Sequence, residues 1–220
     1  MKKKPPPGSR LSVSDPWPQN AVQNNSIDGD RDLWLYAQSF HKAAKTLAGA
    51  LDLDSGQVTD FDVSPVVFMY RHAVELHLKA LVLGEGGNFL KSKPDALSVH
   101  KTHSVPWLAQ FVCQIVSALK WEKEFRSEGI ETLADFRAII EELNAVDPGS
   151  YVFRLPVSAE GQGAVPGGGN LTIRDFTRLM DALLNLLDST ADALAAEWDL
   201  RPAAPTEANG SGGGFEPTIQ

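Results

Sequence analysis

Between residues 29 and 200, apolar residues recur every three to four positions, and this spacing constrains the fold more than any other feature. Such a period places apolar side chains along one face of an α-helix. It predicts five helices, with apolar stripes at residues 33–51, 63–81, 108–119, 133–143 and 173–194. Residues 151–157 (YVFRLPV) alternate as in a strand, but one strand cannot form a sheet. We therefore expect an all-α bundle of about five helices with a short extended arm.

The expected helix ends carry recognisable signals. Ser104 is a natural N-cap for the third helix, and Pro106 suits its first turn. Thr172 and Asp175 form a predicted capping box at the start of the last helix. Stop signals follow the first, second and fourth helices at residues 54–56 (DSG), 84–87 (GEGG) and 147–149 (DPG).

Composition divides the chain of 220 residues into three parts. Residues 1–28 are rich in Pro, Ser, Asn and Gln, which predicts a disordered N-terminal segment. Residues 201–220 are rich in Gly, Pro and Ala, which predicts a flexible tail. We expect residues 29–200 to form a single helical domain, because that length can bury a sizeable core.

Charge and cysteine content restrict the function. A net charge of −8 argues against a broad basic surface for duplex nucleic acid. The single cysteine, Cys113, excludes an internal disulfide and lies in an apolar run, which predicts a buried, inert thiol in a reducing cytoplasm. Since no run reaches the roughly 18 apolar residues of a membrane span, we expect a cytoplasmic protein with no membrane contact.

The second predicted helix carries an unusual set of polar residues in an apolar run. Arg71, Glu75 and Lys79 follow one another at intervals of four, and His77 shares the apolar stripe of Tyr70. One interpretation is a ladder of attracting charges beside a histidine that faces the core. The other is an Arg71–His77 pair in which arginine holds a phosphate and histidine moves a proton. A six-residue step would leave those two side chains roughly 120° apart around the helix axis.

Three weaker signals in the sequence have simple structural interpretations. His100 and His103 could bind a metal ion from one turn, but no cysteine or carboxylate cluster completes a site, so we predict surface histidines and no metal or cofactor. Residues 161–170 (GQGAVPGGGN) lack the Gly-Lys-Ser/Thr ending of a phosphate-binding loop, which indicates a mobile loop. Arg154 lies among apolar residues, so burial would require a partner such as Glu75 or a nucleotide phosphate.

Residues 70–84 (YRHAVELHLKALVLG), 103–108 (HSVPWL) and 153–156 (FRLP) resemble the HEPN superfamily of helical nucleotide-binding domains. The superfamily motif Ala-x-Glu-x-x-x-Lys-Ala-Leu is matched by Ala73, Glu75, Lys79, Ala80 and Leu81. His103 matches the histidine of a later His-Asp-Leu motif, whose other positions are here Ser104 and Val105. The resemblance covers roughly residues 30–195.

The resemblance implies a bundle of four or five helices, commonly a homodimer. Many members are metal-independent ribonucleases of toxin–antitoxin or phage-defence systems, with a motif of Arg, four to six residues, then His on a later helix. Arg71 and His77 have this spacing but lie on the early helix, and no histidine follows His103. By this analogy Arg71 would stabilise phosphorane charge, His77 would act as acid or base, and Lys79, His103 and Arg154 would bind RNA or nucleotide.

Two functions follow as hypotheses. The first is engagement of RNA or nucleotide in a bacterial defence or toxin–antitoxin system. The second is a non-catalytic protein-interaction module, which the missing late motif and the acidic charge favour. The last helix repeats apolar residues at Ile173, Met180, Leu187 and Leu194, a seam that could pack inside the bundle or against a second copy. We expect a homodimer to which this helix contributes, with an antitoxin or another protein as a further partner.

Overall fold

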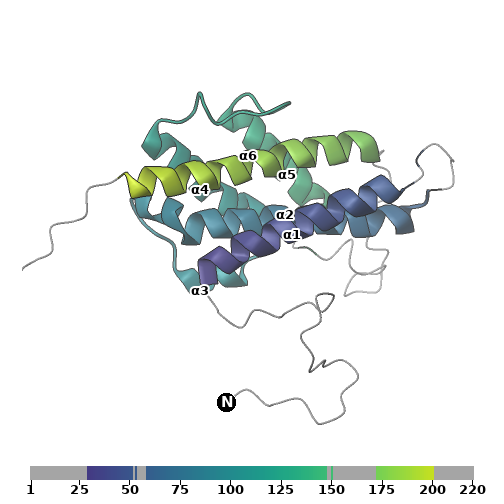
Figure 1. Ribbon diagram of the computed structural model, residues 1–220, viewed down its shortest axis with the longest axis horizontal. Coiled ribbons are helices and arrows are strands. Elements are labelled where there is room, and N and C mark those ends of the chain that lie inside the picture. The colour runs from purple at the N-terminus through teal and green to yellow at the C-terminus, as the bar shows by residue number, and fades with distance from the viewer. Residues whose placement is uncertain (1–28, 52, 54–57, 148–149, 151–171, 201–220) are drawn as a thin grey trace, which may run out of the picture.

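The computed structural model describes residues 29–51, 53, 58–147, 150 and 172–200 (Figure 1). Regular structure in these ranges is helical, apart from an isolated bridge between Ser127 and Ile130. The elements are α1 (Gly29–Ala50), α2 (Asp60–Leu83), η1 (Glu85–Phe89), α3 (Ala96–Lys101), α4 (Val105–Leu119), α5 (Leu133–Val146) and α6 (Ile173–Asp199). The predicted all-α bundle is confirmed, with α3 and η1 as short additions that the period did not reveal. The arm at 151–157, the loop at 161–170 and both predicted disordered ends lie outside the described residues.

Helix α2 is the centre of the bundle. It contacts α1, α3, α4, α6 and η1, whereas α1 and α6 pack against it from the side shown in Figure 1. The helix is apolar around most of its circumference, and its last 18 residues are almost continuously buried. A helix that is apolar on all sides requires neighbours on all sides. Every charged residue in this part of α2 is therefore placed in the interior.

The caps agree with the sequence at one helix and differ at another. Ser104 Oγ accepts a hydrogen bond of 3.3 Å from the backbone N–H of Trp107, so the predicted cap of α4 is confirmed. Thr172 is the N-cap of α6 by position, but its side chain makes no capping hydrogen bond. Asp175 accepts instead from Arg178 Nη2 at 3.3 Å. The predicted capping box at α6 is therefore wrong, because its carboxylate pairs with a cation one turn later.

The apolar seam of α6 packs inside the chain. Met180, Leu183, Leu187 and Leu194 are at most 2% exposed. Ile173, at the first turn, is partly buried against the same core. Of the two alternatives for this seam, interior packing is the one observed, so its buried side chains are not a surface for a second copy.

Cys113 lies on α4 in this core and is buried, as its apolar run predicted. Arg137 Nε of α5 lies 3.3 Å from its sulfur. None of the described helices combines the length and the apolar character that crossing a membrane requires.

Candidate functional site

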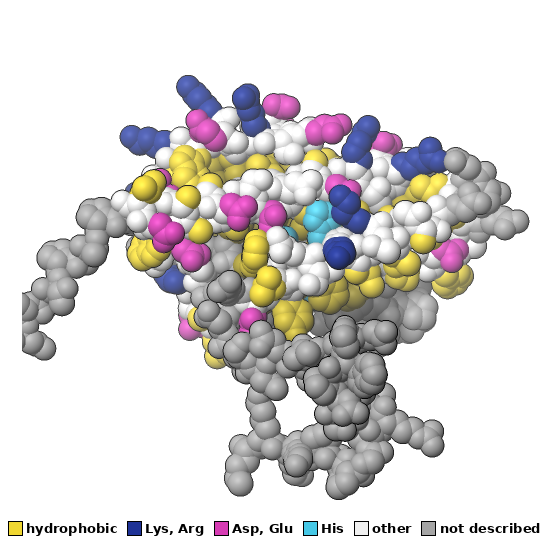
Figure 2. Space-filling model, viewed as in Figure 1, with side chains coloured by type: hydrophobic (Ala, Val, Ile, Leu, Met, Phe, Trp, Pro, Cys, Tyr) yellow, Lys and Arg dark blue, Asp and Glu magenta, His cyan; other side chains and the backbone are white. Residues whose placement is uncertain are grey.

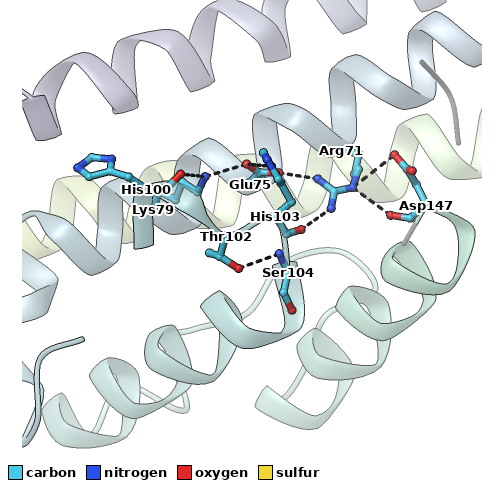
Figure 3. Close-up of polar contacts among 8 residues, drawn as sticks. All are labelled: Arg71, Glu75, Lys79, His100, Thr102, His103, Ser104 and Asp147. Atoms are coloured by element: carbon cyan, nitrogen blue, oxygen red, sulfur yellow. Dashed lines mark hydrogen bonds and ion pairs between the residues drawn. The ribbon is translucent and has the colours of Figure 1, made fainter. Parts of the chain in front are cut away.

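Arg71, Glu75 and Lys79 lie one turn apart on the side of α2 that faces the α3–α4 connection (Figure 3). Arg71 Nη1 donates to Glu75 Oε2 at 2.7 Å, and Lys79 Nζ donates to Glu75 Oε1 at 2.9 Å. The three residues are 0%, 1% and 4% exposed. The ladder of attracting charges that the spacing indicated is therefore present, and the bundle buries it.

The remaining donors of the two cations bind backbone carbonyls of other elements. Arg71 Nη2 donates to the carbonyl of His103 at 2.6 Å, and Lys79 Nζ donates to that of His100 at 3.0 Å. Arg71 Nε donates to the carbonyl of Asp147 at 3.3 Å, at the end of α5. These carbonyls lie in the last turn of α3 or just beyond the ends of α3 and α5, where backbone acceptors lack helical partners. The cluster therefore ties α2 to α3, to the start of α4 and to the end of α5.

Opposite charges balance within the cluster. The carboxylate of Asp147 is wholly buried, and its Oδ2 lies 3.4 Å from Arg71 Nε as an ion pair without hydrogen-bond geometry. Burial by itself would raise the pKa of Glu75, but hydrogen bonds and charge from Lys79, followed by those from Arg71, outweigh it and lower the pKa. Glu75 is therefore ionised at neutral pH. Two buried cations thus face two buried carboxylates, which is the arrangement that a dry interior tolerates.

His103 is the exposed edge of this cluster. Its Nδ1 lies 3.0 Å from Glu75 Oε1, while 44% of its side chain remains exposed. His100 and Lys101 are exposed on the neighbouring α3. In the part of the chain that the structure describes, no group of three or more His, Cys, Asp or Glu side chains could hold a metal ion.

His77 occupies a different environment on the same helix. It is 1% exposed, as its place in the apolar stripe predicted, and neither ring nitrogen has a hydrogen-bond partner. Burial lowers the pKa of His77 to about 4; the charge of Asp188 acts against this shift and that of His41 adds to it. The imidazole is therefore neutral at pH 7.

The structure does not bring Arg71 and His77 together. Arg71 is bound to His103 of the α3–α4 connection and to Asp147 at the end of α5, whereas the charges acting on His77 belong to α1 and α6. Glu75 connects three of the predicted site residues: Arg71, Lys79 and His103. Arg154 lies outside the described residues. Their assignment as catalytic or RNA-binding groups stays a prediction.

A second polar cluster joins α1, α2 and α6, and sequence reasoning missed it. Asp181 Oδ1 lies 2.7 Å from His41 Nε2 and accepts from the Tyr70 hydroxyl at 2.9 Å. Burial, the hydrogen bond to Asp181 and the charge of Asp181 together raise the pKa of Tyr70 well above its usual value.

Two turns further along α6, Asp188 Oδ1 accepts from Trp34 Nε1 at 2.9 Å and from Gln38 Nε2 at 3.0 Å. Asp181 and Asp188 line the contact of α6 with α1. The signal was a shared spacing: Asp181 and Asp188 are seven residues apart, and so are their partners His41 and Trp34.

Comparisons with models of protein families, with curated proteins and with solved structures find no match to this chain.

Proposed function

We propose that this chain is a divergent HEPN-like domain that acts as a protein-interaction module without ribonuclease chemistry. The observation that supports it is the state of Arg71. Its guanidinium is 0% exposed and donates to Glu75, to the carbonyl of His103 and to the carbonyl of Asp147. An arginine that binds a transferring phosphate must offer donors to that phosphate. Here protein groups engage every nitrogen of the guanidinium.

The state of His77 supports the same proposal. A general acid or base has to reach the proton that it transfers, directly or through one water molecule. His77 is buried on another side of α2, and its pKa of about 4 lies far below neutral pH. The Arg-x5-His spacing is explained by two structural roles: one residue ties loops to α2, and the other fills the core.

The family resemblance supplies the setting of this proposal. It implies a cytoplasmic homodimer in a bacterial toxin–antitoxin or phage-defence system, with an antitoxin or another protein as partner. The chain's excess of acidic residues is consistent with a protein partner, because broad nucleic-acid surfaces are basic.

Engagement of RNA or nucleotide is the second candidate. The observation that favours it is the exposed edge of the cluster, where the ring of His103 remains accessible beside the exposed His100 and Lys101. A phosphate could approach there without entering the buried network. This would be binding at the surface of the bundle rather than cleavage in its interior.

The test compares RNA cleavage and RNA binding by the full chain and two variants. We expect wild type, His77→Leu and His103→Ala to leave labelled RNA intact and to show no binding by fluorescence anisotropy at physiological salt. Crosslinking of the tagged chain in its source cell should recover a stoichiometric protein. Cleavage that is lost in a normally folded His77→Leu variant would replace the proposal with a ribonuclease. RNA binding that His103→Ala abolishes would establish the second candidate.

A further inference from the structure

A groove of about 660 Å³ opens at the end of the bundle where α2 and α6 finish and α1 begins. Figure 1 shows the ends of α2 and α6 side by side there, at the left of the view. Its lining includes Trp34, Trp198, Glu85 and Asp192. The groove shares no lining residue with the Arg71–Glu75–Lys79 cluster.

Two indoles provide its apolar walls. Trp198 is 42% exposed, which is unusual for the largest side chain of a helix that is otherwise buried on its apolar face. Trp34 is partly buried, and the bond from its Nε1 to Asp188 fixes the ring in place. Indoles are the side chains that attract cations most strongly through their ring faces.

The charges around the groove break a local rule of helix stability. From residue 189 to 200, α6 and its C-cap contain three acidic residues, Asp192, Glu197 and Asp199, and no Lys or Arg. Acidic groups at a helix C-terminus oppose the helix dipole, at a cost of about 0.3–1 kcal/mol each. Helix α2 also ends there without a basic residue in its last turn, and Glu85 follows directly. Figure 2 shows acidic and hydrophobic side chains at the left end of the visible face, with some Lys and Arg side chains among them.

The chain itself supplies little positive charge in return. Lys93 also lines the groove, and its Nζ donates to the carbonyl of Leu83 at 3.3 Å, so this ammonium group binds the end of α2 and forms no ion pair with Glu85 or Asp192. Neither Glu85 nor Asp192 forms an ion pair with any described residue. An uncompensated departure from a local rule is expected where a protein binds something.

We infer that this groove is the docking site for a lysine-bearing peptide segment of a protein partner. The ammonium would lie between Glu85 and Asp192, and the aliphatic stem would lie against Trp34 and Trp198. Charge complementarity and the aromatic walls favour this occupant over an acidic or purely apolar one. The inference rests on the proposed interaction function and names its surface and the chemistry of its partner.

The chain contains a segment of matching chemistry, which provides both a probe and a competitor. Residues 2–7 read KKKPPP, and aromatic-lined grooves also accept proline-rich segments. A synthetic peptide of this sequence can be titrated into the full chain while tryptophan fluorescence is recorded. The same peptide with acetylated lysines is the matched control for charge.

We expect the peptide to bind, and acetylation to abolish binding. The double variant Glu85→Gln/Asp192→Asn should weaken binding about tenfold, and Trp198→Ala should weaken it by a similar factor. Asp175→Asn, an exposed carboxylate elsewhere on α6, should change binding less than about twofold. All variants should stay folded, because Glu85, Asp192 and Trp198 are exposed. The double variant should melt no lower than wild type, because neutral side chains do not oppose the helix dipole as carboxylates do.

Failure of binding, or equal binding by the double variant or by the acetylated peptide, would overturn the inference. A Lys2→Ser/Lys3→Ser/Lys4→Ser chain that binds the peptide more tightly than wild type would also overturn it, by making the chain's own terminus the occupant. Crosslinking in the source cell separates the two proposals. If the double variant still recovers the partner, the groove is not its docking site, but the proposed interaction function is retained.

Discussion

Glu75 accepts a hydrogen bond of 2.7 Å from Nη1 of Arg71, one turn earlier on α2, and neither side chain is more than 1% exposed. On a helix surface such a pair would contribute only about 0.2–0.5 kcal/mol. In the interior its removal has a different consequence, because each ion depends on the other to offset lost hydration. The pair is therefore part of the bundle's internal framework, and its contacts position the α3–α4 connection and the end of α5.

Glu75→Gln should lower the free energy of unfolding by about 3–5 kcal/mol, because it leaves Arg71 and Lys79 buried without a carboxylate. Chemical denaturation at pH 7 measures this. Asp175→Asn is the matched control: it breaks an ion pair on α6 whose side chains are each 68% exposed, and it should change stability by less than about 0.5 kcal/mol. Equal, small effects of the two substitutions would show that the α2 cluster is hydrated in solution.

The sequence predicted the members of this cluster but not its surroundings. The i, i+4 spacing of Arg71, Glu75 and Lys79 follows from helix geometry alone. Their burial depends on α3 and on the α3–α4 connection, whose carbonyls at His100 and His103 receive the cations. No periodic pattern marks a six-residue helix, so a single sequence could not locate these acceptors. The central position of α2 was predictable, because an apolar run on every face demands it.

The core position of His77 gives the protein a specific dependence on pH. The pKa of His77 is about 4 in the folded protein, against 6.5 for an imidazole in the unfolded chain. As the pH falls, the unfolded chain therefore binds a proton at His77 before the folded protein does. The stability contributed by the neutral ring is complete above pH 6.5 and is lost between pH 6.5 and about 4. At roughly 1.4 kcal/mol per pH unit, the shift from 6.5 to about 4 corresponds to a full loss of about 3–4 kcal/mol.

His77→Leu should remove this part of the pH dependence. The substitution leaves an apolar side chain in an apolar stripe, so the variant should be at least as stable as wild type at pH 7. Between pH 7 and pH 5 the wild type should lose about 2 kcal/mol more than the variant. Urea denaturation at both pH values gives the comparison. Parallel curves for the two proteins would mean that His77 gains water or a partner on protonation.

The two N-caps of α4 and α6 provide a paired test. Ser104→Ala removes a hydrogen bond to the N–H of Trp107 and should cost about 1 kcal/mol. Thr172→Ala removes a side chain that makes no capping hydrogen bond and should cost only a few tenths of a kcal/mol. Thermal melts of both variants measure the difference. A cost at Thr172 equal to that at Ser104 would restore the capping box that the sequence suggested.

The packing of the α6 seam determines which side chains of α6 are available for a homodimer interface. The sequence predicted which residues repeat along the seam. It could not predict what the seam packs against, because the apolar spacing is the same for a helix of the same chain and for a second copy. In the structure the stripe meets α2, and Leu187 is 0% exposed. Light scattering near twice 23.8 kDa remains the expected result for the chain, with an interface that lies outside these buried side chains.

Leu187→Ala should therefore act as a core substitution. It should cost about 2–5 kcal/mol by removing buried methyl groups and leaving a cavity. This loss of stability should be the same at two protein concentrations that differ about 100-fold. The reason is that a contact inside one chain does not depend on protein concentration, whereas a contact between subunits does. Leu200→Ala, at a position 81% exposed just after α6, is the control and should change stability by less than about 0.5 kcal/mol. If the melting temperature of Leu187→Ala rose with protein concentration more steeply than that of wild type, the seam would contact a second copy. The packing of this face of α6 inside its own chain would then be wrong.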